Sequence, residues 1–224
     1  MHAPNQADTH TVIVRDLGLV DYLPTWRAMQ DFNAQRAPAT GDELWLLQHP
    51  PVYTLGLNTH QAVLDNPTRI PVVRCDRGGD ISYHGPGQLV AYVLMDLRRR
   101  GWGVQQLVHA LEQSVIDFLR ERAIEAERRT GAPGVYVNAK KIAQLGLRIR
   151  QGTSYHGLAF NIDMDLEPFR RIAPCGIQGL EVTQLAALLP REEKLFALAA
   201  AGLRTHLLHH LGYNAAPTPS PGPA

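Results

Sequence analysis

The sequence predicts an α/β fold of the α+β type, in which helices surround a mixed β-sheet core. Stretches with strand and helix spacing follow one another irregularly, and several connections are short enough for antiparallel strands. With 224 residues, 45% hydrophobic and 19% charged, the chain is long enough to bury one sizeable core. No linker interrupts the pattern, so we expect a single domain over residues 1–213. Residues 214–224 form a Pro-rich tail that is predicted to be disordered.

The first half of the chain is expected to be mostly strand. Short runs of β-branched and other apolar residues predict strands over four segments: 10–17 (HTVIVRDL), 42–49 (DELWLLQH), 70–76 (IPVVRCD) and 88–97 (QLVAYVLMDL). Residues 20–36 predict the helix of this half, with Pro24 tolerable only in the first turn.

The second half adds helices at both of its ends. Apolar residues at 107, 108, 111, 115, 118 and 119 have helical spacing and predict a helix over 104–123. Three strands are expected next, over 134–137 (GVYV), 140–150 (KKIAQLGLRIR) and 153–163 (TSYHGLAFNID). A last helix is expected over about 191–211, and we find no internal repeat.

Composition argues against several classes of protein. A net charge of +1 disfavours a general nucleic-acid binder. No apolar run reaches the roughly 18 residues of a membrane span, and the N-terminus lacks the basic-then-apolar order of a secretory signal. Two cysteines, Cys75 and Cys175, do not make a disulfide framework, so we expect a cytoplasmic protein.

A glycine-rich segment, RGGDISYHGPG at 77–87, lies between two predicted strands. Glycines let the backbone approach a ligand closely, so this segment is a candidate substrate cradle. It lacks the lysine and Ser/Thr of a phosphate-binding P-loop, and a strand follows it where a dinucleotide fingerprint needs a helix. A tight hairpin with an exposed polar tip is the alternative interpretation.

Cys175 is the candidate nucleophile. Pro174 precedes it and Gly176 follows it, which favours a sharp bend that projects the side chain and frees backbone amides for an oxyanion. A thiol with a pKa of ~8.5 needs a nearby base or cation to react at neutral pH. The alternative is a small buried hydrophobe, which is the interpretation we favour for Cys75.

Strand alternation selects the candidate base. Lys141 shares a face with Ala143, Leu145, Leu147 and Ile149, so it is predicted to point inward, where burial disfavours its ammonium form. Lys140 shares the wetter face and is predicted to be solvated. No metal site is expected, because no suitably spaced carboxylate or cysteine accompanies His206, His209 and His210.

The chain resembles the lipoyl(octanoyl) transferases of lipoate biosynthesis. The matching blocks, in order, are HPPVYTLG, RGGDISYHGPGQLVAY, GAPGVYV, KIAQLGLRI, HGLAFNID and PCGI followed by VTQL, over roughly residues 12–211. The resemblance implies the fold of the biotin/lipoate ligase catalytic module. It also implies transfer of an octanoyl group from acyl carrier protein, through a cysteine thioester, to a lysine of lipoyl domains, without a cofactor.

The resemblance assigns roles to individual residues. Cys175 matches the acyl-thioester cysteine and Lys141 the lysine that activates it. The matching substrate-contacting positions are Arg77, Gly78, Gly79, Asp80, Ile81, Ser82, Tyr83, His84, Gln144, Leu145, Gly146, Gly157, Leu158 and Ala159. The implied partners are octanoyl-acyl carrier protein, the lipoyl domains of 2-oxoacid dehydrogenase complexes and the glycine cleavage H protein.

Three other functions remain as alternatives. An ATP-dependent lipoate or biotin ligase on the same module would need a nucleotide site and no cysteine nucleophile. A non-catalytic carrier-binding protein would tolerate loss of Cys175 and Lys141. A thioesterase would hydrolyse the acyl-enzyme at the same rate with or without a lipoyl domain.

Overall fold

The computed structural model describes residues 10–59, 64, 66–172 and 181–214. The strands are β1 (Val12–Leu19), β2 (Asp42–Gln48), β3 (Val52–Leu55), β4 (Val72–Arg74), β5 (Ile81–His84), β6 (Gln88–Leu94), β7 (Gly134–Val137), β8 (Lys140–Arg150) and β9 (Thr153–Asn161). The α-helices are α1 (Tyr22–Ala34), α2 (Leu97–Arg100), α3 (Val104–Arg120) and α4 (Leu195–His210), and short 3-10 helices cover Glu167–Arg171 and Leu185–Ala187. Most of the predicted tail, residues 215–224, lies outside this description.

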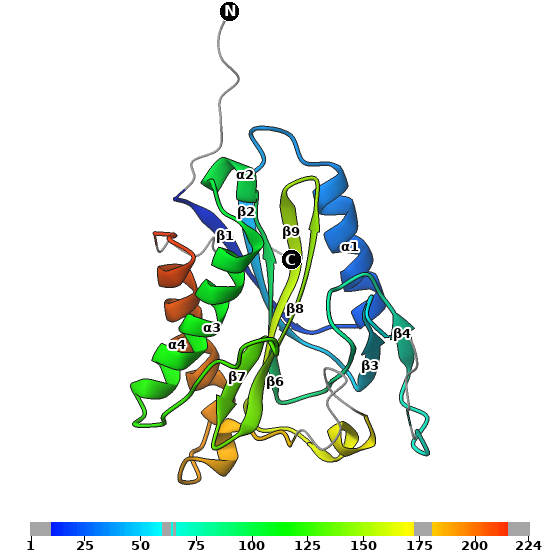
Figure 1. Cartoon of the computed structure of the whole chain (residues 1–224), viewed down its shortest axis with the longest axis vertical. Helices are drawn as coiled ribbons and strands as arrows, with labels where there is room; N and C mark the ends of the chain where they lie inside the picture. The colour runs from blue at the N-terminus through cyan, green and yellow to red at the C-terminus, as the bar shows by residue number, and fades with distance from the viewer. Residues whose placement is uncertain (1–9, 60–63, 65, 173–180, 215–224) are drawn as a thin grey trace, which may run out of the picture.

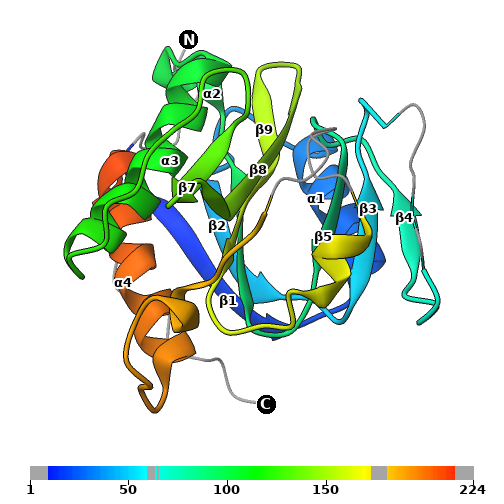
Figure 2. The same ribbon diagram turned by 60° about the horizontal axis from the view of Figure 1, so that its bottom comes forward.

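The strands form two sheets, which Figure 2 shows side by side. The larger sheet has six strands in the order β1-β2-β6-β9-β8-β7, and the smaller has three in the order β4-β3-β5. Strands β1 and β2 are parallel, as are β3 and β4, while the other neighbours are antiparallel. The prediction of a mixed sheet is therefore confirmed.

Helices cover both faces of the larger sheet (Figure 1). On one face, α3 and α4 bury Leu111, Phe118 and Leu207 in the largest hydrophobic cluster. The helical spacing predicted for α3 is thus borne out, because apolar residues three and four apart share its buried side. On the other face, α1 packs Met29 against Tyr92 and neighbouring residues of the sheet. No helix in the described ranges combines the length and apolar content that a bilayer crossing requires.

The centre of the glycine-rich segment is a strand, which neither sequence interpretation included. β5 pairs antiparallel with β3, a strand that the sequence analysis missed, and Ser82 lies opposite Thr54. The chain then turns into β6 of the larger sheet, so β5 and β6 belong to different sheets. The interpretation as a hairpin with an exposed tip is wrong, since Ser82 and His84 are buried.

A β-bulge interrupts the alternation of β8. Tyr136 of β7 lies opposite Lys141, but the preceding Val135 lies opposite Ala143, so Ile142 is an extra residue in β8. Gly134 lies opposite Gln144 on the same side of β7 as Tyr136. The extra residue therefore moves Lys141 onto the face of Gln144.

Candidate active site

A cavity of about 50 Å³ lies where the two sheets meet. Side chains or backbone from α1, β5, β6, β8 and β9 line it. Most of the predicted substrate-contacting residues lie in its wall: Arg77, Gly79, Asp80, Ile81, Ser82, His84, Gln144, Leu145, Gly146, Gly157, Leu158 and Ala159. Three segments that are far apart in the sequence therefore meet around one cavity.

Two predicted contact residues lie elsewhere. The backbone N–H of Gly78 donates a hydrogen bond to Leu147 O at 2.8 Å, which ties the loop to β8. Tyr83 alternates with Ser82 and His84 along β5, so its ring points away from the cavity and packs against Tyr53 and Phe169. Both residues therefore support the segment that forms the cavity wall without lining the cavity.

Glycines let β8, β9 and the loop approach one another. Gly146 lies opposite Gly157 in the β8–β9 pair. A methyl group at Gly146 would lie 3.0 Å from Arg77 Cδ, and one at Gly157 would overlap the carbonyl oxygen of Ala91. The pair therefore leaves room for the Arg77 side chain across β8 and for close contact between β9 and β6.

Arg77 is a fixed positive charge beside the cavity. Its Nη2 donates to Thr54 O at 2.7 Å and to Thr54 Oγ1 at 2.8 Å, and its Nη1 donates to Gly78 O at 3.0 Å. The side chain is buried, yet these acceptors are neutral oxygens. The guanidinium can therefore attract an anionic or strongly polar substrate group in a site of low dielectric constant.

Aromatic and histidine side chains form a cluster at the cavity, and the sequence analysis identified only His84 among them. Tyr22, Tyr92 and His156 line the cavity with His84, and His49 packs behind them. His49 Nε2 lies 2.8 Å from the Tyr92 hydroxyl. Burial lowers the pKa of His84 to about 3 and that of His49 to about 4. Both imidazoles are therefore neutral at neutral pH, so His84 acts here as a hydrogen-bonding group and not as a cation.

The sequence analysis found no internal repeat, but it overlooked a repeated tetrapeptide that would have identified His156. The sequence SYHG occurs at residues 82–85 and again at 154–157, and both of its histidines reach the cavity. His156 also has a φ of 58° within β9, a left-handed conformation that is uncommon outside glycine. Such backbone strain concentrates at functional sites, although no sequence pattern here announces it.

Asp76 holds His156 in place. Its carboxylate accepts hydrogen bonds from Trp26 Nε1 at 2.8 Å and from the Tyr155 hydroxyl, and it lies 3.2 Å from His156 Nε2. Burial alone would raise the pKa of Asp76, but the hydrogen bonds from His156, Tyr155 and Trp26 outweigh it and hold that pKa well below its usual range. Asp76 is therefore a permanent carboxylate that fixes the imidazole orientation.

The two neighbouring lysines have different environments. Lys141 is fully buried, with Nζ 5.3 Å from the centre of the Tyr136 ring, whereas the Lys140 side chain is 46% exposed and pairs with Glu181 at 2.9 Å. Burial of Lys141 and solvation of Lys140 are confirmed. The face predicted for Lys141 is wrong, because the bulge at Ile142 places it with Gln144.

Cys175 and Gly176 lie outside the described residues. The described residues that follow them are hydrogen bonded to Lys141: its N–H donates to Glu181 O, and Thr183 N–H donates to Lys141 O, both at 2.9 Å. Asn161 Nδ2 donates to Thr183 O at 3.0 Å. The chain that leaves the cysteine segment is therefore fixed beside the candidate base.

A further set of hydrogen bonds links this region to the histidine cluster. Gln88 Nε2 donates to Asn161 Oδ1 at 2.9 Å, and Gln88 Oε1 lies 2.7 Å from His84 Nδ1. His84, Gln88, Asn161 and Thr183 therefore form a continuous polar path to the backbone of Lys141.

Comparison with known proteins identifies the family. Residues 21–204 match the lipoyl protein ligase A/B catalytic domain. The chain belongs to this family. An octanoyltransferase from Thiobacillus denitrificans is 64% identical over 174 residues, covering 78% of this chain and 80% of that enzyme. An octanoyltransferase from Nitrosococcus oceani is 55% identical over 205 residues, covering 92% and 91%.

A solved structure of a family relative agrees in fold. A chain in the structure of the bipartite lipoate protein ligase of Thermoplasma acidophilum with its E2 lipoyl domain has a TM-score of 0.66 to this chain. The two are 16% identical, and the match covers 88% of this chain and 84% of the other. The predicted ligase-like catalytic module is therefore confirmed.

Proposed function

We propose that this chain transfers an octanoyl group from acyl carrier protein to a lysine ε-amine of lipoyl domains in the cytoplasm, through a thioester on Cys175. The observation that carries this proposal is the 64% and 55% identity with octanoyltransferases over most of the chain. The acceptors are the lipoyl domains of 2-oxoacid dehydrogenase complexes and the glycine cleavage H protein. The cavity wall also supports the proposal, because residues matched to the family's substrate-contacting positions meet around it.

Lys141 is the proposed general base for Cys175. It is buried on the face of Gln144, which lines the cavity, and its backbone is bonded to the chain just after the cysteine segment. Cys175 is three positions after Ile172 in the sequence, so an extended chain allows at most about 11 Å between their Cα atoms. Ile172 packs with Ile81, a cavity residue.

The first half-reaction forms the acyl-enzyme. The Lys141 amine takes the proton of Cys175 Sγ as that sulfur attacks the thioester carbonyl of the octanoyl carrier. The bond between carbonyl carbon and carrier sulfur then breaks, and the Lys141 ammonium returns its proton to the departing thiolate. Exchange of one thioester for another is nearly isoenergetic, so this step requires no nucleotide.

The second half-reaction forms the amide. The ε-amine of the acceptor lysine must be neutral to attack, so Lys141 accepts a proton from the incoming ammonium. The amine attacks the Cys175 thioester, the carbon–sulfur bond breaks and the sulfur leaves as a thiolate. Of the two protons that the nitrogen loses in becoming an amide, the one held by Lys141 returns to the sulfur and the other passes to water. Backbone N–H groups of Cys175 and Gly176 are proposed to stabilise the oxyanion in both halves.

Apolar lining provides affinity for the acyl chain. Ile81, Val90 and Leu158 contribute apolar atoms to the cavity wall. Each buried methylene contributes ~0.8 kcal/mol, so six would contribute roughly 5 kcal/mol before losses. Because longer chains would gain more affinity, a closed inner end must exclude them, and the Tyr22–Tyr92–His84 cluster is the proposed barrier.

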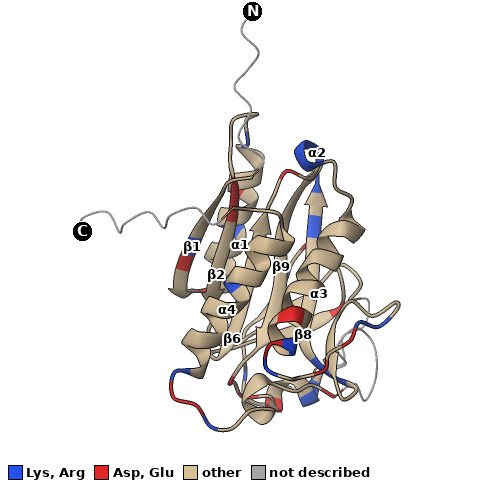
Figure 3. Cartoon of the chain, turned by 90° about the vertical axis from the view of Figure 1, so that its left-hand side faces the viewer, with Lys and Arg blue, Asp and Glu red and all other residues tan. Residues whose placement is uncertain are grey.

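Arg170 and Arg171 are the proposed docking charges for the acidic carrier proteins, because they lie just before the cysteine segment; Arg171 pairs with Glu167 at 2.6 Å, and Arg170 is exposed. Two other arginines with basic neighbours serve the fold instead. Arg99 of α2 pairs with the buried Asp42 at 2.6 Å. Figure 3 shows the basic residues of α2 at one end of the molecule. Arg128 pairs with Glu112 at 3.0 Å.

Intact-mass analysis after mixing with octanoyl-acyl carrier protein, without ATP, tests the proposal. We expect an octanoyl adduct on the wild type, none on Cys175→Ala, slow formation with Lys141→Ala and near-normal formation with the matched control Lys140→Ala. Adding a lipoyl domain should discharge the adduct onto that domain faster than water does. A requirement for ATP would favour a ligase. A discharge rate that the lipoyl domain does not change would favour a thioesterase, and function that persists in Cys175→Ala would favour a non-catalytic binding protein.

A further inference from the structure

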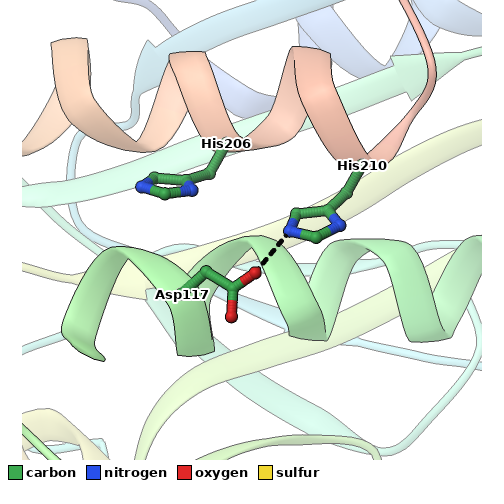
Figure 4. Close-up of side chains that lie close together, drawn as sticks. All are labelled: Asp117, His206 and His210. Atoms are coloured by element: carbon green, nitrogen blue, oxygen red, sulfur yellow. Dashed lines mark hydrogen bonds and ion pairs between the residues drawn. The ribbon is translucent and has the colours of Figure 1, made fainter. Parts of the chain in front are cut away.

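Two helices on the face opposite the cavity bring four metal-ligating side chains together. Asp117 of α3 lies four residues before Glu121, the C-cap of that helix, and His206 and His210 are four residues apart on α4. Figure 4 shows Asp117, His206 and His210. His210 Nε2 lies 2.7 Å from Asp117 Oδ2, and His206 Nε2 lies 3.1 Å from Glu121 Oε1. Candidate ligand atoms of Asp117, His206 and His210 all lie within 4.8 Å of one another.

This arrangement corrects a premise of the sequence analysis. No carboxylate with suitable spacing accompanies the histidines along α4, and for this reason the sequence analysis expected no metal site. The packing of α3 against α4 supplies the carboxylates from a different helix. His209, which is also on α4, is exposed and is not part of the cluster.

Neighbouring side chains orient the Asp117 carboxylate. Its Oδ1 accepts a hydrogen bond from Gln113 Nε2 at 2.6 Å and forms an ion pair with Arg120 Nη2 at 3.0 Å. Its Oδ2 is thereby directed at His210. Metal-binding carboxylates are commonly held in this way through the oxygen that does not ligate.

We propose that Asp117, His206 and His210 form a binding site for a divalent transition-metal ion of the zinc class, to which the 61% exposed Glu121 side chain rotates as the fourth ligand. Zn–N and Zn–O bonds of about 2.0–2.2 Å require tetrahedral donor atoms roughly 3.3 Å apart, and the three donor atoms, which lie within 4.8 Å of one another, reach this spacing by small side-chain rotations. The ion replaces the Nε2 protons that the carboxylates otherwise accept. Two neutral imidazoles and two carboxylates balance its double positive charge.

The ion would join α3 to α4. These helices cover the face of the large sheet opposite α1, so the site is separated from the cavity by the sheet. Imidazole and carboxylate donors suit Zn²⁺ and Co²⁺ better than Mg²⁺, which prefers all-oxygen sites. The expected role is stabilisation of the helix pair, independent of the proposed acyl transfer.

Cobalt titration of the chelator-treated full chain tests the proposal. We expect visible absorption bands of four-coordinate Co²⁺ that saturate at one equivalent and disappear on addition of Zn²⁺. Zinc at 100 times its dissociation constant should raise Tm by roughly 5–10 °C. His206→Ala and His210→Ala should each weaken binding at least about tenfold, and His209→Ala is the matched control. The same titrations with Cys175→Ala exclude thiolate ligation in the catalytic region.

Several results would overturn the proposal. The first is absence of metal binding by the wild type. The second is a full cobalt absorption and Tm shift in both His206→Ala and His210→Ala. The third is a loss of metal binding in His209→Ala equal to that in these two variants. Metal-free melting curves show whether each variant is folded. His210→Gln, which keeps a hydrogen-bond donor for Asp117, provides a second test if the alanine variants do not fold. Loss of metal-dependent stability with acyl transfer intact would separate this site from the proposed function.

Discussion

Gly134→Ala should impair catalysis through the position of Lys141. Gly134 has a φ of 141°, and an added methyl group would overlap Lys141 Cε. The methyl would also lie 2.6 Å from Ala143 O and 3.2 Å from Lys141 Nζ. A glycine here therefore makes the space through which the lysine side chain passes.

The size of the effect follows from these contacts. Ordinary non-bonded separations are about 3.5–4.0 Å, so the overlap requires a shift of about 1 Å by the lysine or the strand. Misplacement of a catalytic group by that distance costs about a hundredfold in rate. Overpacking should also lower the free energy of unfolding by about 1–3 kcal/mol.

Single-turnover acylation of Cys175 by octanoyl-acyl carrier protein, followed by intact mass, measures this rate. Gly131→Ala is the matched control, because Gly131 also has positive φ, 78°, but has no atom within 4 Å of an added methyl group. Both variants should lose some stability, and only Gly134→Ala should acylate about a hundredfold more slowly. Equal acylation rates in two folded variants would refute the role assigned to Lys141.

Three further predictions concern stability, measured by urea unfolding. His49 and His84 bind protons near pH 6.5 in the unfolded chain, but only near pH 4 and pH 3 in the folded protein. Lowering the pH from 8 to 5 should therefore reduce the free energy of unfolding by about 4 kcal/mol. If the double variant His49→Gln, His84→Gln kept the same dependence of this free energy on pH, the prediction would be wrong. Asp42→Ala should cost about 3–5 kcal/mol, because it leaves buried guanidinium groups unpaired, and a loss below 1 kcal/mol would argue against the ion pairs. Asn161→Ala should cost about 2–3 kcal/mol, because Thr183 O loses its donor, and an unchanged midpoint would count against this hydrogen bond.

The sequence predicted the framework because its long elements carry strong periodic patterns. The apolar spacing of α3 and the strand character of β6 are both confirmed, since α3 buries the side that its pattern marks and every residue of β6 is buried. The strands β3 and β5 were missed, because β3 directly follows Pro50 and Pro51 and β5 lies within a glycine-rich stretch, although the equally short β7 was predicted. Tertiary pairing between them, and not local pattern, determines that they are strands.

The site was predictable where motifs carried it and hidden where packing created it. The segments around Arg77, Gln144 and Gly157 were expected to contact substrate, and they meet at one cavity. Tyr22 and His156 were missed, because their proximity depends on how α1 and β9 pack and on the strained backbone of His156. A short repeat was the available signal for His156.

The extra residue in β8 has a consequence for how this chain tolerates change. Deleting Ile142 would restore regular pleating and leave the pairs of β7 and β8 in place, so Lys141 would remain on the face of Gln144. A regular strand that kept Ile142 would instead turn Lys140 to that face and Lys141 to the opposite one. The bulge therefore decides which of two adjacent amines shares a face with Gln144, and losing it without losing a residue would be more damaging than most substitutions.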